Sequence, residues 1–158
     1  ALKSNALASA NLSLLSDIIC CPGGDFCALA NAKSIPIAES IQRQFSDVKE
    51  QQAVGELSIN ISGCMNACGH HHVGNIGILG VDKKGAEFYQ VSLGGSSRHE
   101  ASLGSIIGPA FAQEDIPGVI EKLVDVYKAE KKNGEKFIET YNRIGIDPFK
   151  EKVYVKAD

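Results

Sequence analysis

The sequence predicts an α+β fold in which a mixed β-sheet is layered with helices. Strand patterns occur at residues 17–20, 56–62 and 75–93, and apolar residues recur at helical spacing in 116–127 and 137–144. These segments do not alternate as a regular series of βαβ units, which favours a layered mixed arrangement. The chain has 158 residues, 44% of them hydrophobic and 22% charged, so it can bury the core of one ordinary domain.

The first third of the chain predicts short elements separated by breaks. Residues 1–16 are rich in Ala, Leu and Ser and predict a helical turn or two. Residues 17–20 form an apolar run that ends at a Pro-Gly-Gly sequence, which predicts a strand running into a turn. Residues 28–45 have a helical composition; Pro36 predicts a kink or two abutting helices, with Ser34 as N-cap of the second.

The centre of the chain predicts β structure. Residues 56–62 alternate apolar and polar side chains strictly, as in a half-buried strand. Residues 75–81 and 87–93 predict the two arms of a β-hairpin, because the turn residues at 82–85 end in a glycine that can adopt positive φ. Residues 98–113 show no clean period.

The last third predicts two amphipathic helices. One covers 116–127 and is expected to end at the C-cap Asn133-Gly134, and the other covers 137–144. Residues 147–158 alternate basic and acidic side chains, which predicts a surface tail. The predicted organisation is therefore one domain over residues 1–146 followed by this tail.

Charge and hydropathy exclude several classes of partner. The net charge is −3 and no basic stripe is present, so a nucleic-acid surface is not expected. No apolar run approaches the roughly 20 residues needed to span a bilayer, and no secretory signal is found. The odd number of cysteines, five, argues against a secreted disulfide framework. The sequence therefore predicts a cytoplasmic protein with no nucleic-acid and no membrane partner.

Four cysteines form two pairs that suit a metal or cluster site. Cys21 and Cys27 have the spacing C-x5-C, Cys64 and Cys68 have the spacing C-x3-C, and 36 residues separate the pairs. Structural zinc sites favour C-x2-C to C-x4-C at both ends, whereas a 4Fe–4S cluster takes four cysteine thiolates from separate loops. A zinc-stabilised or disulfide-stabilised binding domain remains an alternative. The fifth cysteine, Cys20, is expected to be a small buried hydrophobic residue.

Glycines flank the cysteines at both ends of the predicted site. Gly23 and Gly24 lie inside the first pair, and Gly63 and Gly69 bracket the second. Without a Cβ, these residues allow the backbone to approach closely and to direct N–H groups at cluster sulfurs, which tunes the reduction potential. The glycines therefore favour a cluster over a simple pair of turns.

Two peptide segments carry a resemblance to a known family. The first is Cys21-Pro22-Gly23-Gly24-Asp25-Phe26-Cys27, and the second is Gly63-Cys64-Met65-Asn66-Ala67-Cys68-Gly69. Together they resemble the cluster signature in the C-terminal half of the sulfite/nitrite reductase haemoproteins, which contain sirohaem and a 4Fe–4S cluster. The agreement continues at residues 75–80 and 93–95 and covers most of residues 17–146.

The resemblance implies the fold of a nitrite/sulfite reductase 4Fe–4S domain and a set of ligands. Cys21, Cys27, Cys64 and Cys68 would bind the cluster. Cys68 would also bridge through its sulfur to the iron of the second cofactor, sirohaem. Asn66 would cap the turn between the last two cysteines or touch the edge of the haem.

The resemblance also implies an oxidoreductase that reduces sulfite to sulfide or nitrite to ammonia with six electrons. Its partners would be the N-terminal half of the same reductase and an electron donor, either ferredoxin or a flavoprotein. The basic residues that bind the oxyanion lie in other parts of the family enzymes. No catalytic residue is therefore assigned here, and the isolated chain is predicted to be inactive.

Three consecutive histidines follow the second cysteine pair. On a helix, His70, His71 and His72 would point about 100° apart, so they would not all face one site. The sequence is compatible with one of these histidines lying near the cofactors. It is also compatible with all three being packed or solvated.

Overall fold

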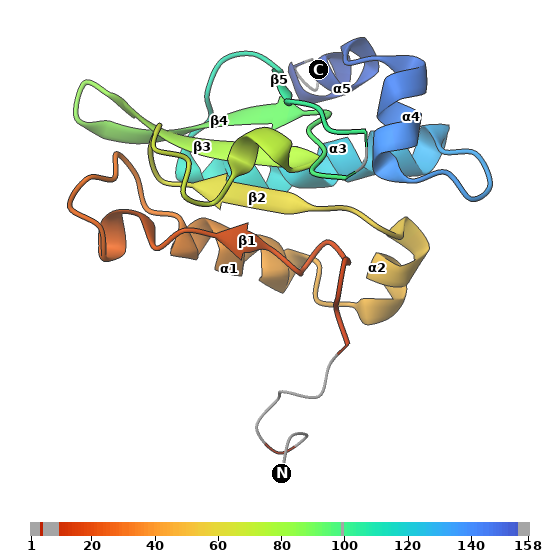
Figure 1. Ribbon diagram of the computed structural model, residues 1–158, viewed down its shortest axis with the longest axis horizontal. Helices are drawn as coiled ribbons and strands as arrows, with labels where there is room; N and C mark the ends of the chain where they lie inside the picture. Colours follow the sequence, from red (N-terminus) through yellow and green to blue (C-terminus); the bar gives the residue numbers. More distant parts are fainter. Residues whose placement is uncertain (1–3, 5–9, 99, 155–158) are drawn as a thin grey trace.

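The computed structural model describes residue 4, residues 10–98 and residues 100–154, and these contain one five-stranded sheet in the order β1-β2-β3-β4-β5 (Figure 1). The first three strands pair in parallel and the last two pairings are antiparallel. The strands are β1 (Ile19–Cys20), β2 (Ile59–Ser62), β3 (Ile76–Lys83), β4 (Ala86–Leu93) and β5 (Ser105–Ile106). The mixed sheet with its helices confirms the predicted α+β class.

The β3–β4 hairpin forms where the sequence predicted it. Its register runs from Ile76 opposite Leu93 to Lys83 opposite Ala86. The two turn residues, Lys84 and Gly85, have φ values of 57° and 83°. Two positive φ values in a two-residue loop match the right-handed twist of the flanking strands.

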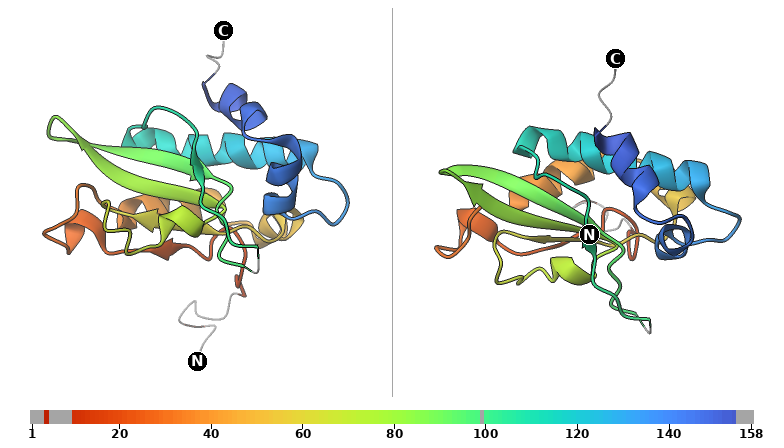
Figure 2. Two further views of the ribbon diagram at one scale, coloured as in Figure 1. Left: turned by 45° about the horizontal axis from the view of Figure 1, so that its top comes forward. Right: turned by 90° about the horizontal axis from the view of Figure 1, so that it is seen from above.

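Helices cover one face of the sheet. Figure 2 shows α1 (Ile35–Gln44) and α3 (Ile116–Glu130) on the same side of the strands. The short helix α2 (Val48–Val54) follows α1 and is capped by the Asp47 carboxylate, which accepts a hydrogen bond from the N–H of Lys49 at 2.8 Å. The fully buried side chains between sheet and helices include Ile37, Ile41, Ile59, Ile61, Ile76, Ile78, Ile120 and Leu123. Within the described residues, no helix has the length and apolar character needed to cross a membrane.

The opposite face of the sheet is covered by the segment between β2 and β3, which contains the 3-10 turn η3 (His71–Val73) (Figure 2). Asn60 and Ser62 lie on this face because Ile59 and Ile61 point to the core. Both are nevertheless buried, with 4% and 1% of their surface exposed. The prediction of a half-buried strand is therefore wrong, since the covering segment buries the polar face as well.

The helical prediction for residues 28–45 is correct only from Ile35 onward. Residues 28–33 form turns and bends, because the N–H groups of Asn31 and Ala32 donate to the carbonyl of Gly63 and not along a helix. The Pro-Gly-Gly turn contains a 3-10 turn, η2 (Gly23–Asp25). A helical turn was predicted within residues 1–16. Of these, residues 10–16 form turns and bends, and the others, apart from residue 4, lie outside the described residues.

The C-terminal helices extend the core beyond the predicted tail. A 3-10 turn, η4 (Gln113–Asp115), precedes α3. Helix α3 ends at Glu130, before the predicted cap at Asn133-Gly134. Helix α4 (Phe137–Ile144) forms as predicted. Residues 147–154 form a further helix, α5 (Asp147–Tyr154), which packs on α3. Phe149 of α5 is fully buried, with its ring centroid 5.7 Å from that of Phe137. The predicted surface tail is thus incorrect over 147–154, because a buried side chain at Phe149 and another at Val153 supply an apolar stripe.

One carboxylate holds the turn between α3 and α4. Glu135 accepts hydrogen bonds from the side chain of Arg143 at 2.7 and 2.8 Å, the N–H of Lys132 at 2.9 Å and the hydroxyl of Thr140 at 2.9 Å. The Arg143 guanidinium above all, and then the Lys132 N–H, lower the pKa of Glu135 to about 2.

Replacement of Phe149 by alanine tests whether α5 belongs to the core. We expect Phe149→Ala to lower the free energy of unfolding by about 3–5 kcal/mol, because it removes a fully buried ring and leaves a cavity. Glu151→Ala, at an exposed position of the same helix, should stay within about 0.5 kcal/mol of the wild type. Urea denaturation measures both, and equal effects of the two variants would contradict the packing of α5.

Glu135 also predicts a pH dependence of stability. Its folded pKa of about 2 lies below the ordinary value of 4.5, so the ionised carboxylate favours the folded state. This contribution is complete above the ordinary pKa and is lost as the pH falls toward 2. Glu135→Gln should therefore lower the free energy of unfolding at neutral pH, with a difference from wild type that shrinks below pH 4.5. A difference that does not change with pH in urea titrations would argue against this assignment.

Candidate functional site

The two cysteine pairs meet at one edge of the sheet. Cys21 follows β1, and Cys64 follows β2 after a single glycine, Gly63. Because β1 and β2 are parallel, their carboxyl ends lie at the same edge. The N–H of Cys21 donates to the carbonyl of Ile61 at 3.1 Å, and the N–H of Gly63 donates to the sulfur of Cys21 at 3.1 Å. The predicted cluster site therefore begins as an extension of the β1–β2 pairing.

The first thiol loop, residues 21–34, folds back on the second. The N–H of Cys27 donates to the carbonyl of Gly23 at 2.9 Å, which closes the turn that carries this half-buried thiol. Further along, the N–H groups of Asn31 and Ala32 both donate to the carbonyl of Gly63, at 2.8 and 3.0 Å. With the Gly63 N–H bond to the Cys21 sulfur, these last two bonds attach the first loop to Gly63 near both of its ends.

The second thiol loop, residues 63–70, is a series of tight turns. The N–H of Ala67 donates to the carbonyl of Cys64 at 3.1 Å, and the N–H of His70 donates to that of Ala67 at 2.7 Å. Ala67 and His70 have φ values of 57° and 54°, a left-handed conformation that is uncommon outside glycine and is often found at functional sites. Cys64 is buried and Cys68 is exposed, so the loop presents one thiol outward.

Two buried polar side chains of β2 support this loop. The hydroxyl of Ser62 accepts a hydrogen bond from the N–H of Gly69 at 3.1 Å. The amide of Asn60 donates to the carbonyls of Gly69 and His70 at 3.1 and 3.2 Å. A Cβ at Gly69 would lie 1.9 Å from the carbonyl oxygen of Ile61, so this position requires glycine. Asn60 and Ser62 are visible in the sequence as the polar positions of an alternating strand, but that pattern predicts solvent exposure.

The donor set differs from that of a single-metal site. Within the described part of the chain, no three Cys, His, Asp or Glu side chains converge as they would around one metal ion. The thiol loops are also rimmed by apolar side chains that point outward. Phe26, Leu29 and Met65 expose 81%, 72% and 81% of their surface. An exposed apolar rim around polar ligands is typical of a surface that another group or chain covers.

Cys20 packs against the core. Its sulfur donates to the carbonyl of Cys21 at 3.1 Å, and the side chain is half-buried against the core. Burial, and then the neighbouring Cys21 thiol, raise the pKa of Cys20 to about 11. This thiol therefore stays protonated at neutral pH, in keeping with the predicted packing role.

The histidines and Asn66 take different environments. His71 is buried against the sheet, and its ring stacks on that of His72 with centroids 3.9 Å apart. Burial, and then the charges of His72 and His70, lower the pKa of His71 to about 4, so its ring is neutral at physiological pH. Within the described residues, Nδ1 of His71 has no hydrogen-bond partner. Asn66 is exposed on the second thiol loop.

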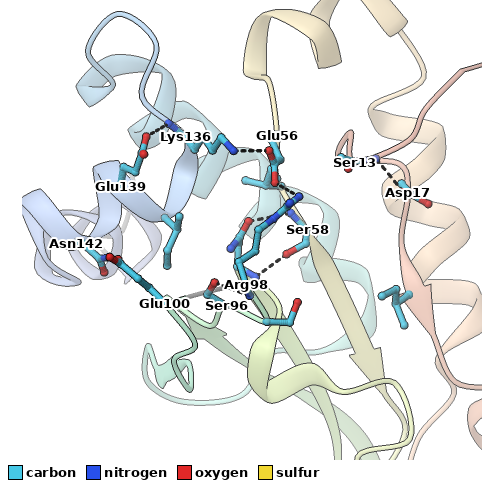
Figure 3. A pocket seen from close by; sticks show the side chains of 15 residues that line it. Ser13, Asp17, Glu56, Ser58, Ser96, Arg98, Glu100, Lys136, Glu139 and Asn142 are labelled. Atoms are coloured by element: carbon cyan, nitrogen blue, oxygen red, sulfur yellow. Dashed lines mark hydrogen bonds and ion pairs between the residues drawn. The ribbon is translucent and has the colours of Figure 1, made fainter.

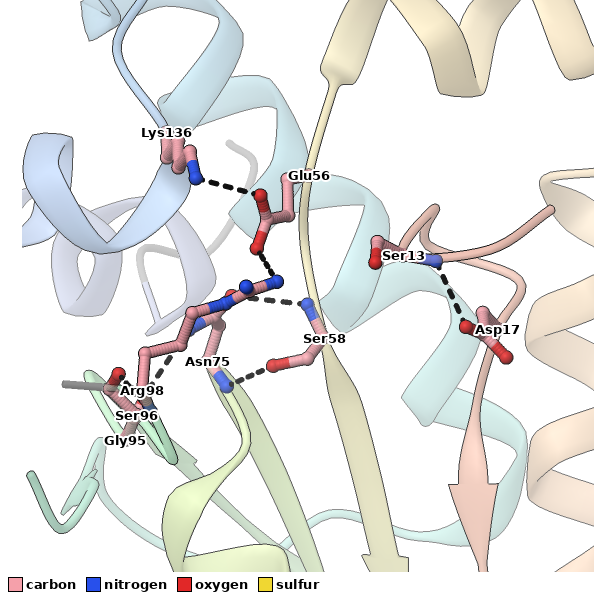
Figure 4. Close-up of polar contacts among 9 residues, drawn as sticks. All are labelled: Ser13, Asp17, Glu56, Ser58, Asn75, Gly95, Ser96, Arg98 and Lys136. Carbon is pink, nitrogen blue, oxygen red and sulfur yellow. Dashed lines mark hydrogen bonds and ion pairs between the residues drawn. The ribbon is translucent and has the colours of Figure 1, made fainter. Parts of the chain in front are cut away.

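A separate polar cleft lies at the other edge of the sheet (Figure 3). It has a volume of about 780 Å³ and is lined in part by Ser58 and Asn75, which precede β2 and β3. At its wall the carboxylate of Glu56 pairs with both Arg98 and Lys136, the latter at 2.9 Å (Figure 4). The amino ends of the parallel strands line this cleft, whereas the thiols follow the carboxyl ends. The cleft is therefore distinct from the thiol site.

Comparisons with known proteins bear on this geometry. A model of the family described as the nitrite and sulphite reductase 4Fe-4S domain matches residues 13–158. The assimilatory ferredoxin-dependent nitrite reductase of Haloferax mediterranei is 28% identical over 138 residues, covering 84% of this chain and 24% of that protein. The cobalt-factor III methyltransferase of Priestia megaterium is 29% identical over 138 residues, covering 87% and 24%. The chain thus spans about a quarter of the length of these relatives.

A solved structure shares the fold. The NirA protein of Mycobacterium tuberculosis superimposes with a TM-score of 0.68 at 24% identity, covering 82% of this chain and 25% of that one. The family match includes β1 to α5 and both thiol loops. On the extent of that match, the chain belongs to the nitrite and sulphite reductase 4Fe-4S domain family.

Proposed function

We propose that this chain is the cluster-binding part of a sirohaem-dependent nitrite or sulfite reductase, an oxidoreductase. Cys21, Cys27, Cys64 and Cys68 would each ligate one iron of a 4Fe–4S cluster. The observation that carries the proposal is the meeting of the two thiol loops through Gly63 at one edge of the sheet. This contact brings together cysteines that are far apart in the sequence.

The residues present suit a cluster better than a single metal ion. A 4Fe–4S cluster takes four cysteine thiolates, and the two thiol loops together supply four. A thiolate-ligated cluster is negatively charged and is stabilised by N–H donors. The N–H of Gly63 already lies 3.1 Å from the sulfur of Cys21.

Cys68 is the proposed junction with sirohaem. It is the exposed thiol of the second loop, next to the exposed side chains of Met65 and Asn66. Sirohaem, when bound, would supply the iron that holds nitrite or sulfite. In this proposal Cys68 would share its sulfur with that iron, Asn66 would contact the haem edge, and the apolar rim of Phe26, Leu29 and Met65 would be covered.

The complete reaction requires more than this chain. The chain spans about a quarter of the nitrite reductase it matches, so we assign oxyanion binding to an N-terminal half of the same reductase. The named relative is ferredoxin-dependent, which supports ferredoxin as the electron donor; a flavoprotein is the alternative. The proposed activity is the six-electron reduction of nitrite to ammonia or of sulfite to sulfide in the cytoplasm.

A second candidate follows from the methyltransferase relative. That relative is 29% identical to this chain over 138 residues, and the nitrite reductase is 28% identical over 138 residues. In that case the domain would serve cobalt-factor III methylation and not oxyanion reduction. The absorption spectrum of sirohaem and oxyanion-dependent oxidation of a reduced donor, measured on the complete protein, separate the two candidates.

Iron and sulfide analysis tests the ligand assignment. Anaerobically purified wild-type chain should carry roughly four irons and four acid-labile sulfides. Cys68→Ser should lose most of this content, because a ligand is removed, and in the complete reductase it should also abolish the spectral coupling of haem and cluster. Cys20→Ser is the matched control and should retain both, because its thiol faces the core. Stoichiometric zinc without iron in the wild type would instead support the zinc-stabilised binding domain.

An activity measurement tests the division of labour. The purified 158-residue chain should not reduce nitrite or sulfite with a chemical electron donor, even when its cluster is present. The reason is that oxyanion binding is assigned to another part of the reductase. Turnover by this chain above the rate of a Cys68→Ser control would show that the oxyanion site lies within it.

A further inference from the structure

Ser34 stands at a helix N-cap without capping the helix. It directly precedes α1 and is fully buried. An N-cap hydroxyl usually accepts a hydrogen bond from the N–H of the second or third helical residue. The second residue here is Pro36, which has no N–H, and among the described residues the Ser34 side chain makes no capping bond. The hydroxyl is therefore available for another partner.

That partner is a predicted cluster ligand. The hydroxyl oxygen of Ser34 lies 3.5 Å from the sulfur of Cys21. While Cys21 is a free thiol, either its sulfur or the Ser34 oxygen can be the donor. A metal-bound thiolate has no proton, so the Ser34 hydroxyl must then donate. Among the described residues, Cys21 is the one predicted ligand whose sulfur takes part in a side-chain hydrogen bond.

Two glycines make the space that this hydroxyl occupies. A Cβ at Gly23 would lie 2.6 Å from the hydroxyl oxygen of Ser34, and a Cβ at Gly63 would lie 2.9 Å from it. Both distances are too short for a methyl group. The first glycine belongs to the first thiol loop and the second to the second, so the hydroxyl sits where the loops meet. Backbone on both sides fixes it against the Cys21 sulfur.

Other polar groups in and next to the first thiol loop are engaged elsewhere. The thiol of Cys20, at the end of β1, donates to the carbonyl of Cys21. The ammonium group of Lys33 pairs with Asp25 at 3.5 Å, and the Lys33 N–H donates to Glu87 at 3.0 Å. The Cys21 sulfur is thus approached by two donors from the described chain, the N–H of Gly63 and the hydroxyl of Ser34.

We propose that Ser34 is a positioning residue whose hydroxyl donates to the Cys21 thiolate and raises the reduction potential of the cluster. The inference rests on the proposed function, because it requires Cys21 to be a ligand. Reduction adds negative charge to the cluster and its sulfurs, so a hydrogen-bond donor stabilises the reduced state more than the oxidised one. Removal of the hydroxyl therefore favours the oxidised cluster.

Ser34→Ala tests the proposal, with Ser40→Ala as the matched control. The hydroxyl of Ser40, also in α1, donates to the carbonyl of Ile37 at 2.7 Å and contacts no thiol. At the midpoint potential of the wild type, Ser34→Ala should lower the ratio of reduced to oxidised cluster by about three- to tenfold, where tenfold equals 59 mV for one electron. A redox titration followed by electron paramagnetic resonance measures this ratio. Ser40→Ala should match the wild type.

The iron content of each variant separates a failure of the proposed Ser34 role from a failure of the cluster assignment. If Ser34→Ala keeps its cluster with an unchanged potential, the proposed role of Ser34 is overturned while the cluster assignment stands. A wild type without a cluster would overturn the proposed function and, with it, the role of Ser34.

Discussion

The thiol site depends on one backbone contact, made at Gly63. Its N–H donates to the sulfur of Cys21, and its carbonyl accepts from the N–H groups of Asn31 and Ala32. A Cβ at this position would lie 2.6 Å from the carbonyl oxygen of Ala32, so any other residue would push the loops apart. A residue without a side chain thus determines how the two thiol loops meet.

The sheet supports the second thiol loop through polar groups that are themselves buried. Asn60 and Ser62 would be costly to bury without partners, and the loop supplies those partners through the backbone of Gly69 and His70. In return, these bonds hold His70 in a left-handed conformation. The outer face of β2 is therefore specific for this loop, in contrast to a generic solvent-facing strand.

Local signals predicted the elements whose hydrogen bonds are local. The Lys84–Gly85 turn and the α4 helix formed as expected. The assignment of the four cysteines as ligands, made from their spacing and the resemblance, stays a prediction. Residues 28–33 were mistaken for helix because distant Gly63 takes their N–H groups. The contacts of Ser34, Asn60 and Ser62 were not predicted, because their partners are also distant in the sequence. Each has an ordinary local interpretation, as a cap or an exposed strand position, and acquires its role from residues remote in the sequence.

The parallel pairing of β1 with β2 has a consequence for how the chain folds. Residues 21–58 form the crossover between these strands, and the two cysteine pairs lie at its start and just beyond β2. A cofactor bound to all four thiols would cross-link the two ends of that crossover. In the chain-entropy treatment, a cross-link closing a loop of this length destabilises the unfolded ensemble by about 4 kcal/mol. If the four thiols hold a cluster as proposed, closure of the crossover and capture of the cofactor would be thermodynamically coupled, and each would make the other more favourable.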